Sequence, residues 1–138
     1  MVDTLAAQLP ALRDRARAVM HQAYAPYSHF RVGAALLADD GSVSVGCNVE
    51  NASYPAGTCA ERAALGTAVA TGRQRFTAVV ISTEAEAPTP PCGICRQAFA
   101  EFGLGLTVVS FTTNGAEARW SLTELLPHAF SPSSLNSR

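Results

Sequence analysis

The sequence has little charge and no surplus of either sign. Lys and Arg number 10, Asp and Glu number 11, and charged residues make up only 15% of the 138 residues. A nucleic-acid binder needs a basic patch to neutralise phosphates, so we expect no nucleic-acid partner. The one basic cluster, Arg13, Arg15 and Arg17, alternates with other residues on a predicted helix and is interpreted as a solvated face.

Long hydrophobic runs and a targeting signal are also missing. No apolar run approaches the roughly 20 residues that span a bilayer. The N-terminal stretch MVDTLAAQLP lacks the basic start and apolar segment of a signal peptide. We therefore expect no membrane partner and a cytoplasmic location, where thiols stay reduced. The few cysteines, Cys47, Cys59, Cys92 and Cys95, are then expected to act as ligands or catalysts rather than as disulfides.

What is present is a regular succession of helical and extended patterns. Apolar residues recur at helical spacing from about 10 to 22, and Pro10 suits the first turn of that helix. Further apolar periodicity predicts helices at 58–70, 92–102 and 121–126. Alternating and β-branched runs predict strands at 30–38, 42–50, 76–83 and 106–113.

The order of these elements, α-β-β-α-β-α-β-α, indicates the fold class. Two βα crossovers imply at least three parallel strands, and the opening hairpin adds an antiparallel one. We expect an α/β fold, a three-layer α-β-α sandwich in which helices cover both faces of a mixed β-sheet. No repeat or linker is visible, so residues 1–138 are predicted to form a single domain with a polar, mobile tail after about residue 130.

Two short segments, TCAERAA (58–64) and PPCGICRQ (90–97), place three thiols at predicted helix starts. Cys92 and Cys95 share a helix face, a spacing used by metal sites and by redox dithiols such as the CGPC type of thioredoxin motif. A pair of buried small hydrophobes is the plainer alternative. If the two helices lie side by side, Cys59 joins the pair where helix dipoles favour thiolates, and three thiolates suit zinc.

Glu61 and Arg62 fit around such a zinc ion. No histidine has a spacing that suggests the fourth ligand a structural zinc site would need, and three ligands leave one position for water, which zinc activates. Glu61, two residues after Cys59, should miss the metal and reach the water or a substrate. Taken alone, it is more simply a helix-start carboxylate stabilised by the dipole, but the three convergent thiols favour the role at the water or substrate. Arg62, three residues after Cys59, can offset the thiolate charge.

At these residues the sequence resembles the small homotetrameric cytidine deaminases. TCAERAA and PCGICRQ match that family's zinc signature of C-A-E and P-C-x-x-C, with Cys59 in place of the histidine of the H-x-E form. The likeness also includes the segments AYAPYSHFRVGAAL (23–36), GCNVENASYP (46–55) and LLPHAF (125–130). It implies the cytidine deaminase-like fold and a homotetramer whose active sites are shared between subunits.

The resemblance also implies a reaction, the hydrolytic deamination of cytidine and 2′-deoxycytidine to uridine and 2′-deoxyuridine with release of ammonia, in pyrimidine salvage. One zinc ion per subunit, held by Cys59, Cys92 and Cys95, presents a hydroxide that attacks C4 of the base. Glu61 takes the proton from water, delivers it to N3 and then protonates the leaving ammonia. Blasticidin-type deaminases share the zinc segments but lack NVEN, and editing of RNA or DNA conflicts with the neutral charge.

The substrate contacts are predicted mainly through the resemblance. Asn48 and Glu50 alternate on a predicted strand, so both side chains leave one face, and in the resembling family these positions bind the ribose. Phe30 and, from a neighbouring subunit, Phe130 are implied to contact the pyrimidine. Cys47 should point the other way as a small core residue. Further implied positions are Ala60 through its backbone, Tyr54 in the pocket or at the subunit boundary, and Gln97 beside the thiolates.

Overall fold

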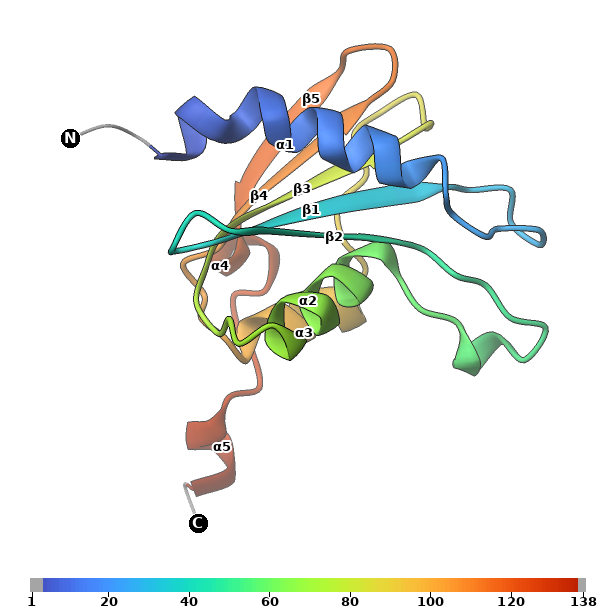
Figure 1. Ribbon diagram of the computed structural model, residues 1–138. Helices are drawn as coiled ribbons and strands as arrows, with labels where there is room; N and C mark the ends of the chain where they lie inside the picture. Colours follow the sequence, from blue (N-terminus) through green and yellow to red (C-terminus); the bar gives the residue numbers. More distant parts are fainter. Residues whose placement is uncertain (1–3, 137–138) are drawn as a thin grey trace.

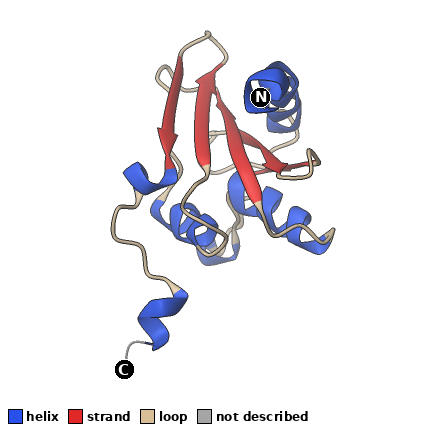
Figure 2. Cartoon of the chain, turned by 90° about the vertical axis from the view of Figure 1, so that its left-hand side faces the viewer, coloured by secondary structure: helices blue, strands red, loops and turns tan. Residues whose placement is uncertain are grey.

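The computed structural model describes residues 4–136, which form a five-stranded sheet with helices on both faces (Figure 1). Helix α1 covers one face, and α2 and α3 cover the other (Figure 2). The strands are β1 (Val32–Ala38), β2 (Val43–Cys47), β3 (Phe76–Thr83), β4 (Thr107–Thr112) and β5 (Glu117–Ser121). The helices are α1 (Thr4–Met20), α2 (Ala60–Ala70), α3 (Gly93–Ala100), α4 (Leu122–Leu125) and α5 (Pro132–Asn136), with a 3-10 turn at Tyr54–Ala56.

The strand order is β2-β1-β3-β4-β5, and only β3 and β4 pair in parallel. β1 is antiparallel to both of its neighbours, and β5 is antiparallel to β4. β2, β3 and β4 therefore run in one direction, as predicted, but β1 lies between β2 and β3. The prediction of three parallel strands is right in direction and wrong in pairing, because the connection through α2 passes over β1 before it reaches β3.

Alternate residues of the central strands pack on opposite faces of the sheet. On β1, Ala35 and Leu37 belong to the core beneath α1, whereas Ala34 and Leu36 belong to the core beneath α2. Because both faces are covered, the central strands are continuous apolar runs rather than alternating ones. The α1 side buries Leu5, Leu9, Leu12, Ala16, Ala78, Val80, Val109 and Phe111 as well. This arrangement confirms the predicted α/β sandwich with a mixed sheet.

Helix α1 begins at Thr4, well before the predicted start near residue 10. Pro10 consequently lies inside the helix and not in its first turn. The reason is the buried stripe, which extends through Leu9 to Leu5 at the helix N-terminus. Burial of this stripe outweighs the loss of one backbone hydrogen bond at Pro10, whose ring is exposed.

The C-terminal third contains two elements that the prediction omits. β5 is an edge strand with exposed Glu117 and Arg119, so it lacks the apolar pattern of the inner strands. Residues Pro132–Asn136 of the tail form α5, which stands away from the sheet in both views (Figures 1 and 2). The predicted start of α4 is confirmed, since Ser121 and Glu124 form a reciprocal capping box.

None of the helices within residues 4–136 combines the length and the hydropathy that crossing a membrane requires.

Close packing of β2 against α2 requires a residue without a side chain at position 46. A Cβ atom on Gly46 would lie 2.4 Å from the backbone N of Ala64 and 2.6 Å from the backbone O of Ala60. Gly46→Ala should push α2 away from the sheet and lower the free energy of unfolding by about 2 kcal/mol, as overpacked cores do. Urea denaturation measures this change.

Gly66→Ala, on the same helix, is the matched control. A Cβ atom there meets nothing within 4 Å, so this variant should instead gain about 0.5–1 kcal/mol from helix propensity. A Gly46→Ala protein as stable as the wild type would contradict the close approach of β2 and α2.

Candidate active site

The three cysteines predicted as ligands lie at the N-terminal ends of α2 and α3. Cys59 and Cys92 are the N-cap residues of these helices, both with extended backbone, and neither side chain makes a capping hydrogen bond. Cys95 lies in the first turn of α3 and is buried. Because helix N-termini favour anionic groups, the three thiols occupy positions where thiolates are stabilised.

The sulfur atoms form one cluster. Cys59 Sγ lies 3.8 Å from Cys92 Sγ, and Cys92 Sγ lies 3.5 Å from Cys95 Sγ. All three sulfurs are within 4.8 Å of one another. A tetrahedral zinc ion with Zn–S bonds of about 2.3 Å holds its sulfurs about 3.8 Å apart. The cluster therefore has the dimensions and the soft donor atoms of a zinc site.

The structure weighs against structural zinc and against a redox dithiol as interpretations of these thiols. Within residues 4–136, this cluster is the one group of three or more His, Cys, Asp or Glu side chains able to hold a metal ion, and no fourth such side chain joins it. A structural zinc site would normally have four protein ligands. A redox pair would use only Cys92 and Cys95 and would leave the position of Cys59 in the same cluster unexplained.

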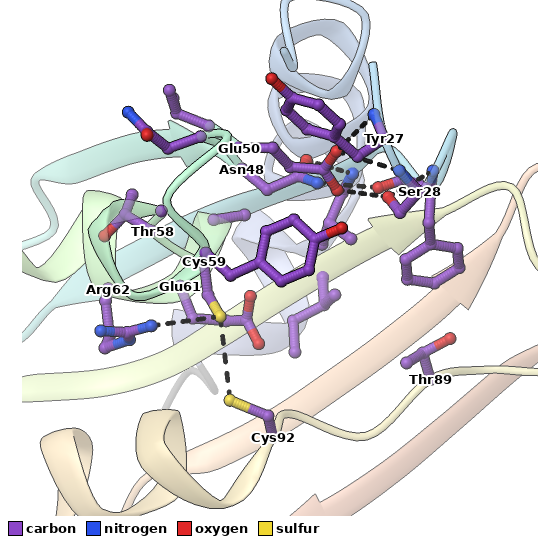
Figure 3. Close-up of a pocket in the computed structure, with 18 of the residues that line it drawn as sticks. Tyr27, Ser28, Asn48, Glu50, Thr58, Cys59, Glu61, Arg62, Thr89 and Cys92 are labelled. Atoms are coloured by element: carbon purple, nitrogen blue, oxygen red, sulfur yellow. Dashed lines mark hydrogen bonds between the residues drawn. The ribbon is translucent and has the colours of Figure 1, made fainter. Parts of the chain in front are cut away.

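Arg62 lies beside the thiols on α2. Its Nη2 donates a hydrogen bond to Cys59 Sγ at 3.4 Å (Figure 3). Hydrogen bonds from Cys95 and Arg62 hold the pKa of the Cys59 thiol well below its ordinary value. The Cys59 thiolate in turn raises the pKa of Arg62. These contacts are the ones expected of an arginine that offsets thiolate charge.

Glu61 is the only buried carboxylate in the part of the chain described, with 6% of its surface exposed. Its carboxyl group lies beside Cys59 and faces the cavity (Figure 3). Burial, with a further contribution from the charge on Cys59, raises the pKa of Glu61 to about 7. A carboxyl group with such a pKa can accept a proton and return it near neutral pH.

A cavity of about 660 Å³ opens over the thiols, a volume typical of small-molecule sites (Figure 3). Its walls come from the loop before β1, the segment between β2 and α2, and the loop before α3. The fold thus brings together three segments that are far apart in the sequence. Most predicted site residues line the cavity, namely Phe30, Asn48, Glu50, Tyr54, Cys59, Ala60, Glu61, Arg62 and Cys92.

Asn48 and Glu50 lie beyond the end of β2 and not on it, because the strand ends at Cys47. Both still line the cavity. The Asn48 side chain accepts a hydrogen bond from the Val32 N–H at 2.8 Å and donates one to the Phe30 carbonyl at 2.7 Å. Asn48 therefore ties the segment after β2 to the loop before β1.

Three predicted site residues are not part of the cavity lining of this chain, namely Cys95, which is buried within the thiol cluster, Gln97 and Phe130. Phe130 is 58% exposed, and its carbonyl oxygen accepts a hydrogen bond from Gln97 Nε2 at 2.7 Å. Gln97 thus holds the backbone at Phe130. The sequence analysis places Gln97 beside the thiolates and does not predict this contact. The roles of Gln97 and Phe130 toward zinc and substrate stay predictions.

Cys47 also lies outside the cavity lining. It pairs with Gly33, whose Cβ would point at α1, so Cys47 faces the α1 side as predicted. It is half-buried and belongs to neither core cluster, since it ends a strand at the edge of the sheet.

The prediction omits several residues that line the cavity, among them Tyr27, Ser28 and Thr89. Tyr27 and Ser28 lie in the loop between α1 and β1, and Thr89 lies in a proline-rich loop. Polar loop residues of this kind have no periodicity to mark them. The one available signal is that Tyr27 and Ser28 fall within AYAPYSHFRVGAAL, one of the segments of the family resemblance.

Comparison with known proteins gives consistent matches. Residues 7–111 match the family described as cytidine and deoxycytidylate deaminase zinc-binding region. The cytidine deaminase of Sporosarcina psychrophila is 47% identical over 116 residues, which cover 83% of this chain and 85% of that protein. The cytidine deaminase of Halalkalibacterium halodurans is 46% identical over 115 residues, covering 83% and 87% respectively.

Solved structures agree with these sequence matches. The cytidine deaminase of Burkholderia pseudomallei superimposes with a TM-score of 0.84 and 48% identity, covering 88% of this chain and 98% of that one. The cytidine deaminase of Mycobacterium tuberculosis gives a TM-score of 0.77 and 39% identity, covering 94% and 98%. The family match spans all three clustered cysteines and Glu61. The chain therefore belongs to the cytidine and deoxycytidylate deaminase zinc-binding family.

Proposed function

We propose that this protein hydrolyses cytidine and 2′-deoxycytidine to uridine and 2′-deoxyuridine with release of ammonia. The proposal rests mainly on the buried Glu61 carboxyl group, which lies beside three clustered thiols at one cavity. Relatives named cytidine deaminase, 46–47% identical over most of the chain, support the choice of substrate.

Cys59, Cys92 and Cys95 would hold zinc, whose Lewis acidity lowers the pKa of a water molecule toward neutrality. Glu61 accepts a proton from the water that adds to C4 of the base. The same carboxyl group delivers that proton to N3, then takes the second proton from the hydroxyl group now on C4 and passes it to the amino group, which leaves as ammonia while C4 becomes a carbonyl. Its pKa near 7 suits a group that must take and give a proton in one turnover.

The cavity walls suit the two halves of a nucleoside. Phe30, Val32 and Ile81 supply apolar surface for the pyrimidine ring. Ala60, at the first position of α2, has a backbone N–H without a helical partner and can donate to the base. Residues 48–51 all line the cavity, and the side chains of Asn48, Glu50 and Asn51 carry polar groups for the sugar. This NVEN segment supports a cytidine-type substrate over the blasticidin-type alternative.

We further infer a homotetramer in which Phe130 reaches the cavity of a neighbouring subunit. The 58% exposure of Phe130 outside the cavity of its own chain supports this arrangement. Glu61→Gln and Phe130→Ala chains should each have low activity alone. Co-expressed, they should form mixed oligomers in which about a quarter of the sites contain both native residues. Activity no higher than that of the two parents would contradict the sharing of sites.

The remaining parts of the proposal concern the setting of the enzyme. We place it in the cytoplasm, in pyrimidine salvage, with residues 1–138 acting as one catalytic domain. The four cysteines are free, as a thiolate metal site needs them to be, and a reducing compartment keeps them so.

Product analysis tests the proposed reaction. The purified, zinc-loaded protein should release ammonia from cytidine and form uridine in equal amount. A folded, zinc-bound protein that releases no ammonia from cytidine or 2′-deoxycytidine would contradict the proposal and leave the metal site intact.

A further inference from the structure

The loop before β1 contains a residue that connects two walls of the cavity. Ser28 lines the cavity between Glu50 and Phe30. Its hydroxyl group donates a hydrogen bond to Glu50 Oε2 and accepts one from the Phe30 N–H at 3.0 Å (Figure 3). Glu50 Oε1 accepts two more, from the backbone N–H groups of Tyr27 and Ser28 at 3.0 and 3.1 Å.

These contacts nearly saturate the Glu50 carboxylate. An ionised carboxylate has about four acceptor positions, and the loop before β1 occupies three of them. One position, on Oε2, is left for a ligand that donates a single O–H or N–H. The Ser28 hydroxyl is also the largest cause that holds the pKa of Glu50 below its usual value, so the group stays an acceptor.

The backbone around Ser28 needs these hydrogen bonds. His29, the next residue, has φ of 57°, the left-handed region that a residue with a Cβ adopts only at a cost. It separates Ser28 from Phe30 and turns the chain so that both face the cavity. The two hydrogen bonds of the Ser28 hydroxyl bridge this turn and connect it to Glu50.

We propose that Ser28 is a positioning residue, which orients Glu50 to accept one hydroxyl group of the nucleoside sugar. This inference rests on the proposed function, because it takes a nucleoside as the ligand. It assigns Ser28 to substrate binding and not to the proton transfers at Glu61.

Ser28→Ala tests the proposal through the separation of KM from kcat. KM for cytidine should rise about tenfold and kcat should change less than about twofold, because a hydrogen bond to a charged binding group is lost. Ser28→Thr keeps the hydroxyl group and should return KM to within about threefold of the wild type.

Ser42→Ala is the matched control. Ser42 donates to the Asp40 carboxylate at 2.6 Å in the hairpin turn between β1 and β2, outside the cavity lining. Loss of the Ser42 hydroxyl group removes a serine–carboxylate hydrogen bond of the same kind as that between Ser28 and Glu50. KM and kcat should nevertheless stay at the wild-type values. A rise in KM equal to that of Ser28→Ala would contradict a specific role for Ser28.

Substrate analogues separate positioning from general loosening of the loop. The effect of Ser28→Ala is measured with cytidine, 2′,3′-dideoxycytidine and 5′-deoxycytidine. For the analogue that lacks the hydroxyl group reaching Glu50, Ser28→Ala should raise KM less than about twofold. For the other analogue, the rise in KM should persist. An equal rise in KM with all three substrates, or no rise with any, overturns the inference.

Calorimetric titration with uridine distinguishes failure of this inference from failure of the proposed reaction. An active wild type with unchanged KM in Ser28→Ala overturns the inference alone. If the wild type binds uridine but releases no ammonia, and the Ser28→Ala variant binds uridine more weakly than the wild type, only the proposed reaction is overturned. A wild type that does not bind uridine overturns both.

Discussion

Glu61→Gln is expected to lower kcat for cytidine by about 10³- to 10⁴-fold, because one side chain performs several proton transfers that each contribute to the rate. The amide has the same size as the carboxyl group but cannot carry the proton. Folding should be preserved, since burial already disfavours the charge at this position. Steady-state kinetics, zinc content per chain and the thermal unfolding midpoint measure the three expected results.

Glu101→Gln is the matched control for this substitution. Glu101 is exposed at the C-terminal end of α3, away from the cavity lining, so activity should not change. A Glu61→Gln variant that retains more than about a tenth of wild-type kcat would rule out the proton-transfer role, because general acid–base catalysis is worth at least about a hundredfold.

Cys92→Ser is expected to lose zinc and activity together. Substitution even of residues that only support a metal ligand costs about 10- to 100-fold in affinity, so removal of a thiolate should cost more than about 100-fold. Cys92 is exposed and caps α3, so serine in its place should not disturb the core. Metal analysis after dialysis against a weak chelator should find almost no zinc in this variant.

Cys47→Ser is the control that separates ligation from general loss of a thiol. Cys47 is the cysteine outside the cluster, half-buried on the edge strand β2. This variant should keep one zinc ion per chain and its activity. Zinc retained by Cys92→Ser, or lost by Cys47→Ser, would show that the cluster is not the metal site.

The sequence predicts the inner part of the fold well and its edges poorly. β3 matches the predicted strand at 76–83, because a β-branched apolar run buried on both faces has one interpretation. β5 does alternate charged and half-buried residues, but it has only five residues and none that is β-branched, so its strand signal is too weak to stand out from a loop. The insertion of β1 between β2 and β3 depends on tertiary packing, which element order alone does not determine.

The metal cluster was predictable for a physical reason. Thiols at two helix starts converge when both helices cover the same face of a sheet, and short spacing within CGIC supplies the third. The contacts of Ser28 and Asn48 were not predictable, because they join polar groups in segments about twenty residues apart. The role of Phe130 in the cavity of a neighbouring subunit stays a prediction.

A zinc titration of the metal-free protein, with uridine formation measured at each step, tests whether the three thiols and Glu61 form the active site. We expect the rate to rise linearly with bound zinc and to reach its maximum at one ion per chain, with no rise for Glu61→Gln although it binds the metal. Full activity without zinc, or a maximum that requires a different ratio of zinc to chain, would contradict the three-thiol active site.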